Sequence, residues 1–351
     1  MTCPPPADPT PLLTALRAEA LQYQRAAYAP GTLAAANTAL RAYAAFCYVT
    51  GRWPDPNKGT SDDDLILYVA FLARTLSIAT IDNYISMGVA RFHREMGMPW
   101  TPLHQRFQVQ STIRGVQRLK GSTAPTNRKA PVTPEMLRKL RQIYNLQSLH
   151  GMAHFAATLT MFYGLLRKSN VLRGRNTDRH LITRADVRKN ADDSFTILLR
   201  TSKTQQVAGQ QTIPIVLARE STSDVCPATY LDAYMAATAH RPPTDQLFGY
   251  YARTASGGTT WRGLTYDEFL PNFKAALTRA GYTGTAFGAH SLRRGGATHA
   301  FFLGIPDHLI MLLGGWKSPV WHDYVEVQEE LRKRAAASLA SGTTYSPSSS
   351  T

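Results

Sequence analysis

Apolar residues recur every three or four positions through most of the first 120 residues, a spacing typical of amphipathic α-helices. Residues 32–50 carry such a stripe, and Gly51 follows at a position where glycine commonly ends a helix. Ser61 precedes three consecutive aspartates, which favour the positive end of a helix dipole. We therefore predict that a second helix starts at this serine.

Two further helices are predicted in the same region. Thr80 is suited to cap a helix whose apolar stripe runs to Met96 and which Gly97 ends. A weaker periodic pattern predicts a helix over residues 103–119. Together these patterns predict a small helical domain over residues 10–120.

A segment without periodicity follows and divides the chain. Residues 121–131 contain glycine, serine, two prolines and two basic side chains, which is typical of a linker between domains. Its charge fits either a merely soluble linker or a segment that lies along a phosphate backbone. Thr133 and Pro134 then predict the start of a helix, because a capping hydroxyl is followed by proline at the first helical position.

In two segments of the second half of the chain, apolar residues occur at every second position instead of every third or fourth. Residues 195–199 and 213–217 alternate apolar with polar side chains and predict two β-strands joined by a polar loop. Pro214 cannot donate a backbone hydrogen bond, so the second strand is predicted at an edge. Helices are predicted around them over residues 135–144, 149–166, 227–238, 266–280, 291–303 and 305–313.

These elements predict a mainly α-helical protein with a small antiparallel β-sheet. Its two domains are the N-terminal helical domain, residues 10–120, and an α+β domain over residues 132–335. The end of the chain, residues 338–351, is rich in serine and threonine and predicts a disordered tail.

Charge adds information about the partner. The chain has 39 Lys and Arg against 24 Asp and Glu, a net charge of +15, which favours nucleic acid or an anionic membrane surface. No apolar run is long enough to span a bilayer and the start lacks a signal-peptide pattern, so an intracellular location is predicted. The three cysteines, Cys3, Cys47 and Cys226, are too widely spaced for a disulfide framework or a metal cluster. We predict no cofactor and no metal ion.

The last quarter of the chain concentrates residues that suit phosphate chemistry. His290, Arg293, Trp316 and Tyr324 all fall within one short stretch. Arginine reaches two phosphate oxygens with its planar fork, and Arg293 lies in the first turn of a predicted helix, where backbone N–H groups also favour phosphate. This set is suited to hold a phosphodiester while a tyrosine hydroxyl attacks the phosphorus.

Several segments in order resemble the motifs of the tyrosine recombinases, the phage integrase family. Residues 290–298 (HSLRRGGAT), residues 313–318 (LGGWKS) and Tyr324 resemble the family's C-terminal signature. Upstream, residues 163–172 (YGLLRKSNVL) resemble its first arginine motif. The family also places a lysine in a β-hairpin loop, and Lys203 lies in the loop predicted between the two strands.

The resemblance implies how a DNA strand would be cut. Tyr324 would be the nucleophile that forms a 3′-phosphotyrosyl bond and releases a 5′-hydroxyl. Lys203 would protonate the leaving 5′ oxygen, and His290 would take or relay the tyrosine proton. A free phenol has a pKa near 10, so neighbouring cations must favour the phenolate.

The resemblance also implies the groups that hold the scissile phosphate. Arg167 and Arg293 would clamp it, and Trp316 would donate its indole N–H to a phosphate oxygen. Many members have an acidic residue where this chain has Asn170, so an amide would orient Arg167 in place of a carboxylate. Tryptophan stands where histidine is common, and because indole exchanges no proton at neutral pH, acid–base work falls on His290 and Lys203.

Other polar residues carry weaker signals. Basic side chains crowd the helical domain, and they are interpreted either as a solvated face or, given the resemblance, as a surface that contacts duplex DNA. Packing or contact with flanking phosphates is expected for Arg294 and Lys317, and His299, His308 and His322 lack metal-ligand spacing. The candidate DNA-binding residues are Arg74, Arg91, Arg94, Arg114, Arg118, Lys120 and Lys129. His93 lies between two of them in the sequence and is grouped with the same basic surface.

The sequence thus predicts a site-specific DNA recombinase that serves a mobile genetic element, in the nucleus or nucleoid. The resemblance implies double-stranded DNA with inverted half-sites as the partner, bound by homodimers that pair into a tetramer. Residues 325–340 predict an amphipathic helix that docks on a neighbouring protomer or folds back on its own. The alternatives are a type IB topoisomerase, which relaxes DNA by similar chemistry, and a DNA-binding protein whose site has decayed.

Overall fold

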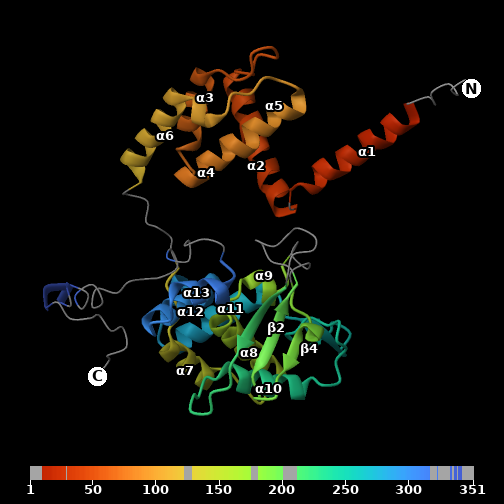
Figure 1. Ribbon diagram of the computed structural model, residues 1–351, viewed down its shortest axis with the longest axis vertical. Coiled ribbons are helices and arrows are strands. Elements are labelled where there is room, and N and C mark those ends of the chain that lie inside the picture. Colours follow the sequence, from red (N-terminus) through yellow and green to blue (C-terminus); the bar gives the residue numbers. More distant parts are fainter. Residues whose placement is uncertain are drawn as a thin grey trace, which may run out of the picture. The chain divides into compact units, whose positions relative to one another are not determined.

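The chain forms two compact units, Met1–Asn127 and Arg128–Thr351, in a computed structural model (Figure 1). The predicted linker contains residues outside the described part of the chain, as do most of the predicted helix 325–340 and the tail. No helix in the described part is long and apolar enough to cross a membrane. The described residues are 10–28, 30–121, 129–174, 181–200, 212–316, 322, 333, 336–337 and 339–341.

The first unit has helices and no named strand in its described residues, with one isolated β-bridge between Asp55 and Gly59. Tyr43, Phe46 and Tyr68 form its aromatic centre, with ring centroids of Tyr43 and Phe46 5.2 Å and 5.1 Å from that of Tyr68. The elements are α1 (Thr10–Ala26), α2 (Pro30–Thr50), α3 (Asp62–Leu72), α4 (Ile78–Asn83), the π-helix η1 (Tyr84–Val89), α5 (Ala90–Met96), the 3₁₀ turn η2 (Leu103–Gln105) and α6 (Phe107–Lys120).

Most of the predicted helix ends are confirmed by their capping geometry. Ser61 accepts a hydrogen bond from the Asp64 amide, and Gly51 and Gly97 adopt left-handed φ of 69° and 67°. The prediction that Thr80 caps the third helix is wrong, since that helix starts at Ile78. Ser77 is the extended N-cap residue, and its hydroxyl lies 2.9 Å from that of Thr80 without bonding a backbone amide of the helix.

The π-helix η1 interrupts the predicted third helix. The wider π-turn lies where Gly88 meets α2, and a Cβ added at Gly88 would lie 2.7 Å from the Cβ of Ala39. Such close contact between backbones requires glycine at this position. The apolar period alone did not predict the π-turn, because Ile81, Ile85 and Val89 follow an ordinary i, i+4 spacing.

The second unit combines helices with two small sheets. The elements are α7 (Pro134–Ile143), α8 (Leu149–Tyr163), α9 (Lys168–Val171), the 3₁₀ turn η4 (Arg184–Asp186), β1 (Val187–Lys189), β2 (Phe195–Leu199), β3 (Ile213–Leu217), α10 (Pro227–Ala237), β4 (Gly249–Arg253), β5 (Thr259–Gly263), α11 (Tyr266–Arg279), the 3₁₀ turn η5 (Gly284–Ala286), α12 (His290–Phe302) and α13 (Asp307–Gly314). The predicted cap is confirmed, since the Thr133 hydroxyl accepts from the Met136 amide.

The predicted strand pair is confirmed, with Ile197 of β2 opposite Ile215 of β3 in an antiparallel register. The order β1-β2-β3 leaves β3 at an edge, as Pro214 predicts. Strands β4 and β5 form a second, two-stranded antiparallel sheet, which the sequence did not predict. Only one residue of this hairpin, Gly249, is buried, so its strands lack the apolar alternation that marks β2 and β3.

Helix α8 lies at the centre of the second unit. It is buried from Ala153 to Phe162 and contacts α7, α10, α12 and β4 (Figure 1). A helix that is apolar on all sides is typical of such a central position. The predicted fold class, mainly α-helical with a small antiparallel sheet, is therefore confirmed, and the β4–β5 sheet is an addition to it. The central helix also fixes the segment that follows it, which carries Arg167.

Candidate active site

The loop between α8 and α9 positions Arg167. Leu165 in this loop has a left-handed φ of 48°, rare for a residue with a branched side chain, and that side chain is buried. Arg167 is the extended N-cap residue of α9 and is half-buried. Asn170, at the position where the related motif carries an acid, is 2% exposed, and its carbonyl accepts from the Ile182 amide at 2.8 Å.

Helix α12 carries the next two predicted residues, His290 and Arg293, and they differ in exposure to solvent. His290 is the first residue of the helix and is exposed. Arg293, one turn later, is 1% exposed. The two side chains share the first turn, but only the arginine enters the interior.

The Arg293 guanidinium connects three segments that are far apart in sequence. One Nη donates to the carbonyl of Leu165, and the other donates to the carbonyl of Gly314 at 2.9 Å. The guanidinium carbon lies 3.8 Å from the centroid of the Trp316 ring, a cation–π contact. The arginine therefore holds the Arg167 loop and the end of α13 against α12.

The Gly314-Gly315-Trp316 motif places the indole under this guanidinium. Gly315 ends α13 with a left-handed φ of 61°, which reverses the chain. A Cβ added at Gly314 would lie 1.7 Å from the Trp316 ring, so only glycine leaves room for the indole. The sequence predicted a phosphate-facing indole N–H and missed the contact with Arg293. Two adjacent glycines directly before a tryptophan are the sequence feature that indicates such close packing of the indole.

The two adjacent glycines of α12, Gly295 and Gly296, allow the helix to pack closely against neighbouring backbone. A Cβ at Gly295 would lie 2.0 Å from the carbonyl oxygen of Val132, and one at Gly296 would lie 2.1 Å from that of Phe162 in α8. The glycines therefore let α12 approach the start of the second unit and the central helix closely. This contact brings Arg293 within reach of the loop that follows α8.

Two of the six predicted catalytic residues, Lys203 and Tyr324, lie outside the described residues, as does Lys317. Of the other four, Arg293 and Trp316 are in direct contact, and the Arg167 loop reaches Arg293 through a backbone carbonyl. The neighbour Arg294 is buried and donates to the Lys129 carbonyl at 2.6 Å, in agreement with the packing expected for it.

The predicted DNA-binding residues differ in exposure and in partners. The side chains of Arg74, Arg94, Arg114, Arg118 and Lys120 are exposed, whereas Arg91 is half-buried. Lys120 donates to the Ala73 carbonyl at 2.6 Å. Lys129 belongs to the second unit and donates to the Thr285 carbonyl at 3.1 Å.

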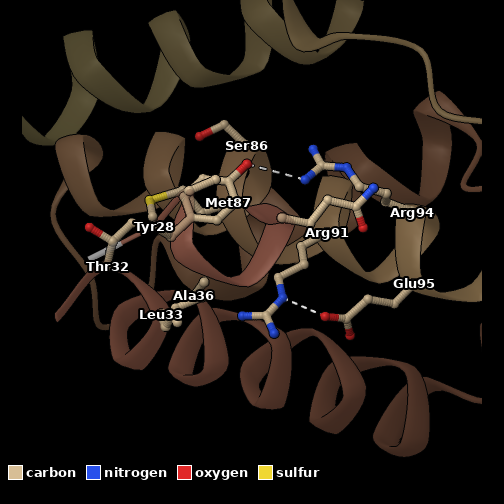
Figure 2. Close-up of a pocket in the computed structure, with 11 residues that line it drawn as sticks. Tyr28, Thr32, Leu33, Ala36, Ser86, Met87, Arg91, Arg94 and Glu95 are labelled. Carbon is tan, nitrogen blue, oxygen red and sulfur yellow. Dashed lines mark hydrogen bonds and ion pairs between the residues drawn. The ribbon is translucent and has the colours of Figure 1, made fainter. Parts of the chain in front are cut away.

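A hollow of about 790 Å³ in the first unit contains two of these arginines (Figure 2). Arg91 pairs with Glu95 at 2.6 Å and donates to Asn37, and Arg94 donates to the Tyr28 hydroxyl at 3.3 Å. Figure 2 shows the Arg94 guanidinium directed at the Tyr28 hydroxyl and the Arg91 guanidinium directed away from it, beside Glu95. The carboxylate offsets part of the positive charge, so Arg94 is the better placed of the two to meet a phosphate.

His93 belongs to the core, and its grouping with the basic surface is wrong. It is fully buried, its Nε2 accepts from the Thr60 amide at 2.9 Å, and its Nδ1 donates to the Val89 carbonyl at 2.8 Å. An amide N–H can only donate, so the ring is neutral with its proton on Nδ1. Burial lowers the pKa of His93, and the nearby Arg106 lowers it further.

This depressed pKa predicts a pH-dependent stability of the first unit. Above the unfolded pKa of about 6.5 both states are neutral. As pH falls below it, the unfolded chain binds a proton that the folded unit excludes, so stability falls. In His93→Gln we expect a loss of about 1–2 kcal/mol at neutral pH and a shallower fall in acid.

Hydrogen exchange of the α5 amides at about pH 7.5 and pH 5.5, compared between the two proteins, measures both effects. The exposed His104 provides the matched control, since His104→Gln should retain the wild-type pH response. An equal pH response in His93→Gln and wild type would contradict the prediction.

The three histidines near the C-terminal motifs lie in different surroundings. His299 packs near Phe162, with ring centroids 6.1 Å apart, and burial lowers its pKa. His308 is exposed on α13, and His322 lies 3.3 Å from the carboxylate of Asp307.

A helical unit joined to a unit in which the loop after α8 meets α12 and the end of α13 has the fold of the tyrosine recombinases. Two solved structures show this likeness. The chain aligns with XerH site-specific recombinase bound to palindromic difH substrate with a TM-score of 0.51 and 16% identity, over 81% of this chain and 71% of that one. It aligns with a lambda integrase (75–356) dimer bound to a COC′ core site with a TM-score of 0.54 and 14% identity, over 89% and 94%. No protein-family model and no curated protein sequence matches the chain.

Proposed function

We propose that this protein is a site-specific DNA recombinase that cuts and rejoins strands through a covalent bond to Tyr324. The observation that carries the proposal is the Arg293 contact set, in which one buried guanidinium meets the Arg167 loop, Gly314 and Trp316. These are the segments that resemble the recombinase motifs, and the fold is that of XerH and lambda integrase.

The proposed reaction is a transesterification. The phenolate oxygen of Tyr324 attacks the scissile phosphorus, a bond from tyrosine to the 3′ phosphate forms, and the bond from phosphorus to the 5′ oxygen breaks. Lys203 gives a proton to the leaving 5′ oxygen, and His290 accepts the phenol proton. Attack by the 5′-hydroxyl of a second strand reverses these steps and restores the free tyrosine.

Arg167 and Arg293 stabilise the charge on the phosphate oxygens during this attack. The two carbonyls fix the plane of Arg293 before substrate arrives, so little reorganisation of the guanidinium is needed in the transition state. Because Arg293 is 1% exposed, contact with a phosphate requires movement of the residues that cover it. Trp316, at the end of a chain reversal, is the covering residue that we expect to move.

The test is capture of the covalent intermediate. Duplexes that carry inverted repeats from DNA flanking the gene, with a nick that lets the cleaved fragment diffuse away, are incubated with protein and resolved on a denaturing gel. We expect a protein–DNA adduct with wild type and none with Tyr324→Phe, since phenylalanine lacks the attacking oxygen.

Tyr345→Phe is the matched control, because Tyr345 is the other tyrosine near the end of the chain, and it should form adduct at the wild-type level. Adduct and plasmid relaxation without recombinant products would indicate a type IB topoisomerase. Absence of adduct on a duplex that the protein demonstrably binds would contradict strand cleavage and support a decayed site.

The helical unit is proposed to bind the duplex beside the cleavage site, with Arg74, Arg94, Arg114 and Arg118 as exposed cations for the phosphates. By analogy with the DNA-bound recombinases of similar fold, we propose a homodimer on inverted half-sites and pairing of two dimers for strand exchange. A role in a mobile genetic element is part of the same proposal.

A further inference from the structure

Two histidines and a glutamate converge at the end of α8 that lies away from Arg167. His150 and His154 are one turn apart on α8, and Glu268 comes from the first turn of α11. Glu268 Oε1 is 3.4 Å from His150 Nε2 and 3.8 Å from His154 Nε2. Since the 15 residues of α8 span about 22 Å, this cluster is separate from the candidate active site.

These three residues lie close enough to one another to share one small divalent ion. Their ligand atoms all lie within 4.8 Å of one another. In a tetrahedral zinc site with bonds of 2.0–2.1 Å, neighbouring ligand atoms are about 3.3 Å apart, which is close to the two distances above. Two imidazole nitrogens and a carboxylate oxygen also form a common ligand set for Zn²⁺.

His154 gives independent support for a ligand at this place. Its side chain is 0% exposed, and neither ring nitrogen has a hydrogen-bond partner among the described residues. Buried polar atoms are nearly always satisfied, so a buried imidazole that faces a carboxylate at 3.8 Å without a hydrogen bond requires an explanation. A metal ion bound at Nε2 would satisfy that nitrogen.

The surrounding side chains fix the geometry of the three ligands. The His154 ring stacks on Phe269, with centroids 5.6 Å apart and planes 4° apart, and the His150 ring lies 4.6 Å from that of Tyr250. The Tyr250 hydroxyl in β4 donates to Glu268 Oε1. Such contacts outside the ligand set orient the ligands of metal sites. His150, with 44% of its side chain exposed, leaves a path from solvent.

We propose that His150, His154 and Glu268 bind a Zn²⁺ ion that fastens α8, α11 and the β4–β5 hairpin together. The fourth coordination position is taken by water. The role of the ion is structural, because the site lies at the other end of α8 from Arg167. The ion joins the first two turns of α8 to the first turn of α11, so its binding stabilises the second unit.

The test uses the untagged full-length protein, stripped with a chelator and dialysed. On addition of ZnCl₂ we expect uptake of one ion per chain and a rise in the unfolding midpoint of roughly 5 °C or more when zinc exceeds its dissociation constant a hundredfold. Co²⁺ in place of Zn²⁺ should give the visible absorption of a tetrahedral site, a readout that does not depend on stability.

His150→Ala and Glu268→Gln should each weaken zinc binding by at least about tenfold and remove the cobalt absorption. Both proteins should match chelated wild type in circular dichroism, since each change is at a partly exposed side chain. His240→Ala is the matched control, because His240 contacts Tyr251 of the same hairpin at 2.9 Å, and it should bind zinc as wild type does. Failure of wild type to take up zinc, or unchanged uptake by both ligand variants, would overturn the proposal.

Discussion

Replacement of Arg293 by lysine is expected to lower the rate of DNA cleavage by a factor of roughly 100 to 1000. Lysine keeps the positive charge, but it offers a single ammonium where the planar guanidinium reaches the carbonyls of both Leu165 and Gly314. The buried carbonyl that loses its donor should reduce the free energy of unfolding by about 1–3 kcal/mol. Single-turnover cleavage of the nicked duplex and denaturant unfolding measure the two effects.

Arg241→Lys is the control for this experiment. Arg241 also lies over an indole, 4.6 Å from the ring centroid of Trp261, but its side chain is only half-buried and pairs with Asp245. It should change cleavage little and stability by less than about 1 kcal/mol. Equal cleavage rates for Arg293→Lys and Arg241→Lys would contradict the role given to Arg293.

Replacement of Gly296 by alanine is expected to cost about 3 kcal/mol of folding stability and most of the cleavage activity. The added Cβ would lie 2.1 Å from the Phe162 carbonyl oxygen and 2.5 Å from Leu165 Cδ2, so α12 must move away from α8. That shift also separates Arg293 from the Leu165 carbonyl. Urea unfolding and the single-turnover assay would show both losses together.

Gly115→Ala is the matched control, because Gly115 also lies within a helix and its added Cβ would meet no atom within 4 Å. Alanine favours a helix over glycine, so this variant should be more stable by up to about 1 kcal/mol. If Gly296→Ala were as stable as Gly115→Ala, the close contact between α12 and α8 would be refuted.

Most of the helices and the strand pair β2–β3 were predictable because their burial is periodic, whereas α1 and α9 were not predicted. Core-facing residues are apolar at i, i+3 and i+4 in a helix and at i, i+2 in a strand, so the sequence shows the same spacing. Capping residues such as Ser61 and Thr133 mark where the helices begin. The hairpin β4–β5 was not predictable in this way, because the core covers little of it. The π-turn at Tyr84–Val89 lies against Ala39, a contact between segments distant in sequence that the local apolar pattern does not carry.

The sequence predicted which residues could form the site, but it did not predict the burial or the contacts of their side chains. The resemblance selected Arg293 and Trp316, yet their contact depends on a chain reversal at Gly315 and on the left-handed Leu165. His93 was misplaced because a histidine next to arginines in sequence can face the opposite side of its helix. The pair His150 and Glu268 went unnoticed because α8 and α11 meet only in the fold.

The Arg293 contacts determine when the site can exist during synthesis of the chain. The arginine bonds to Leu165, 128 residues earlier, and to Gly314, 21 residues later. A ribosome-bound chain that ends before Gly314 lacks the second carbonyl and the indole. The nascent protein therefore lacks the complete Arg293 contact set, even after α8 and α12 have packed together. A chain that is proposed to break DNA thus remains inert until its synthesis has passed this point.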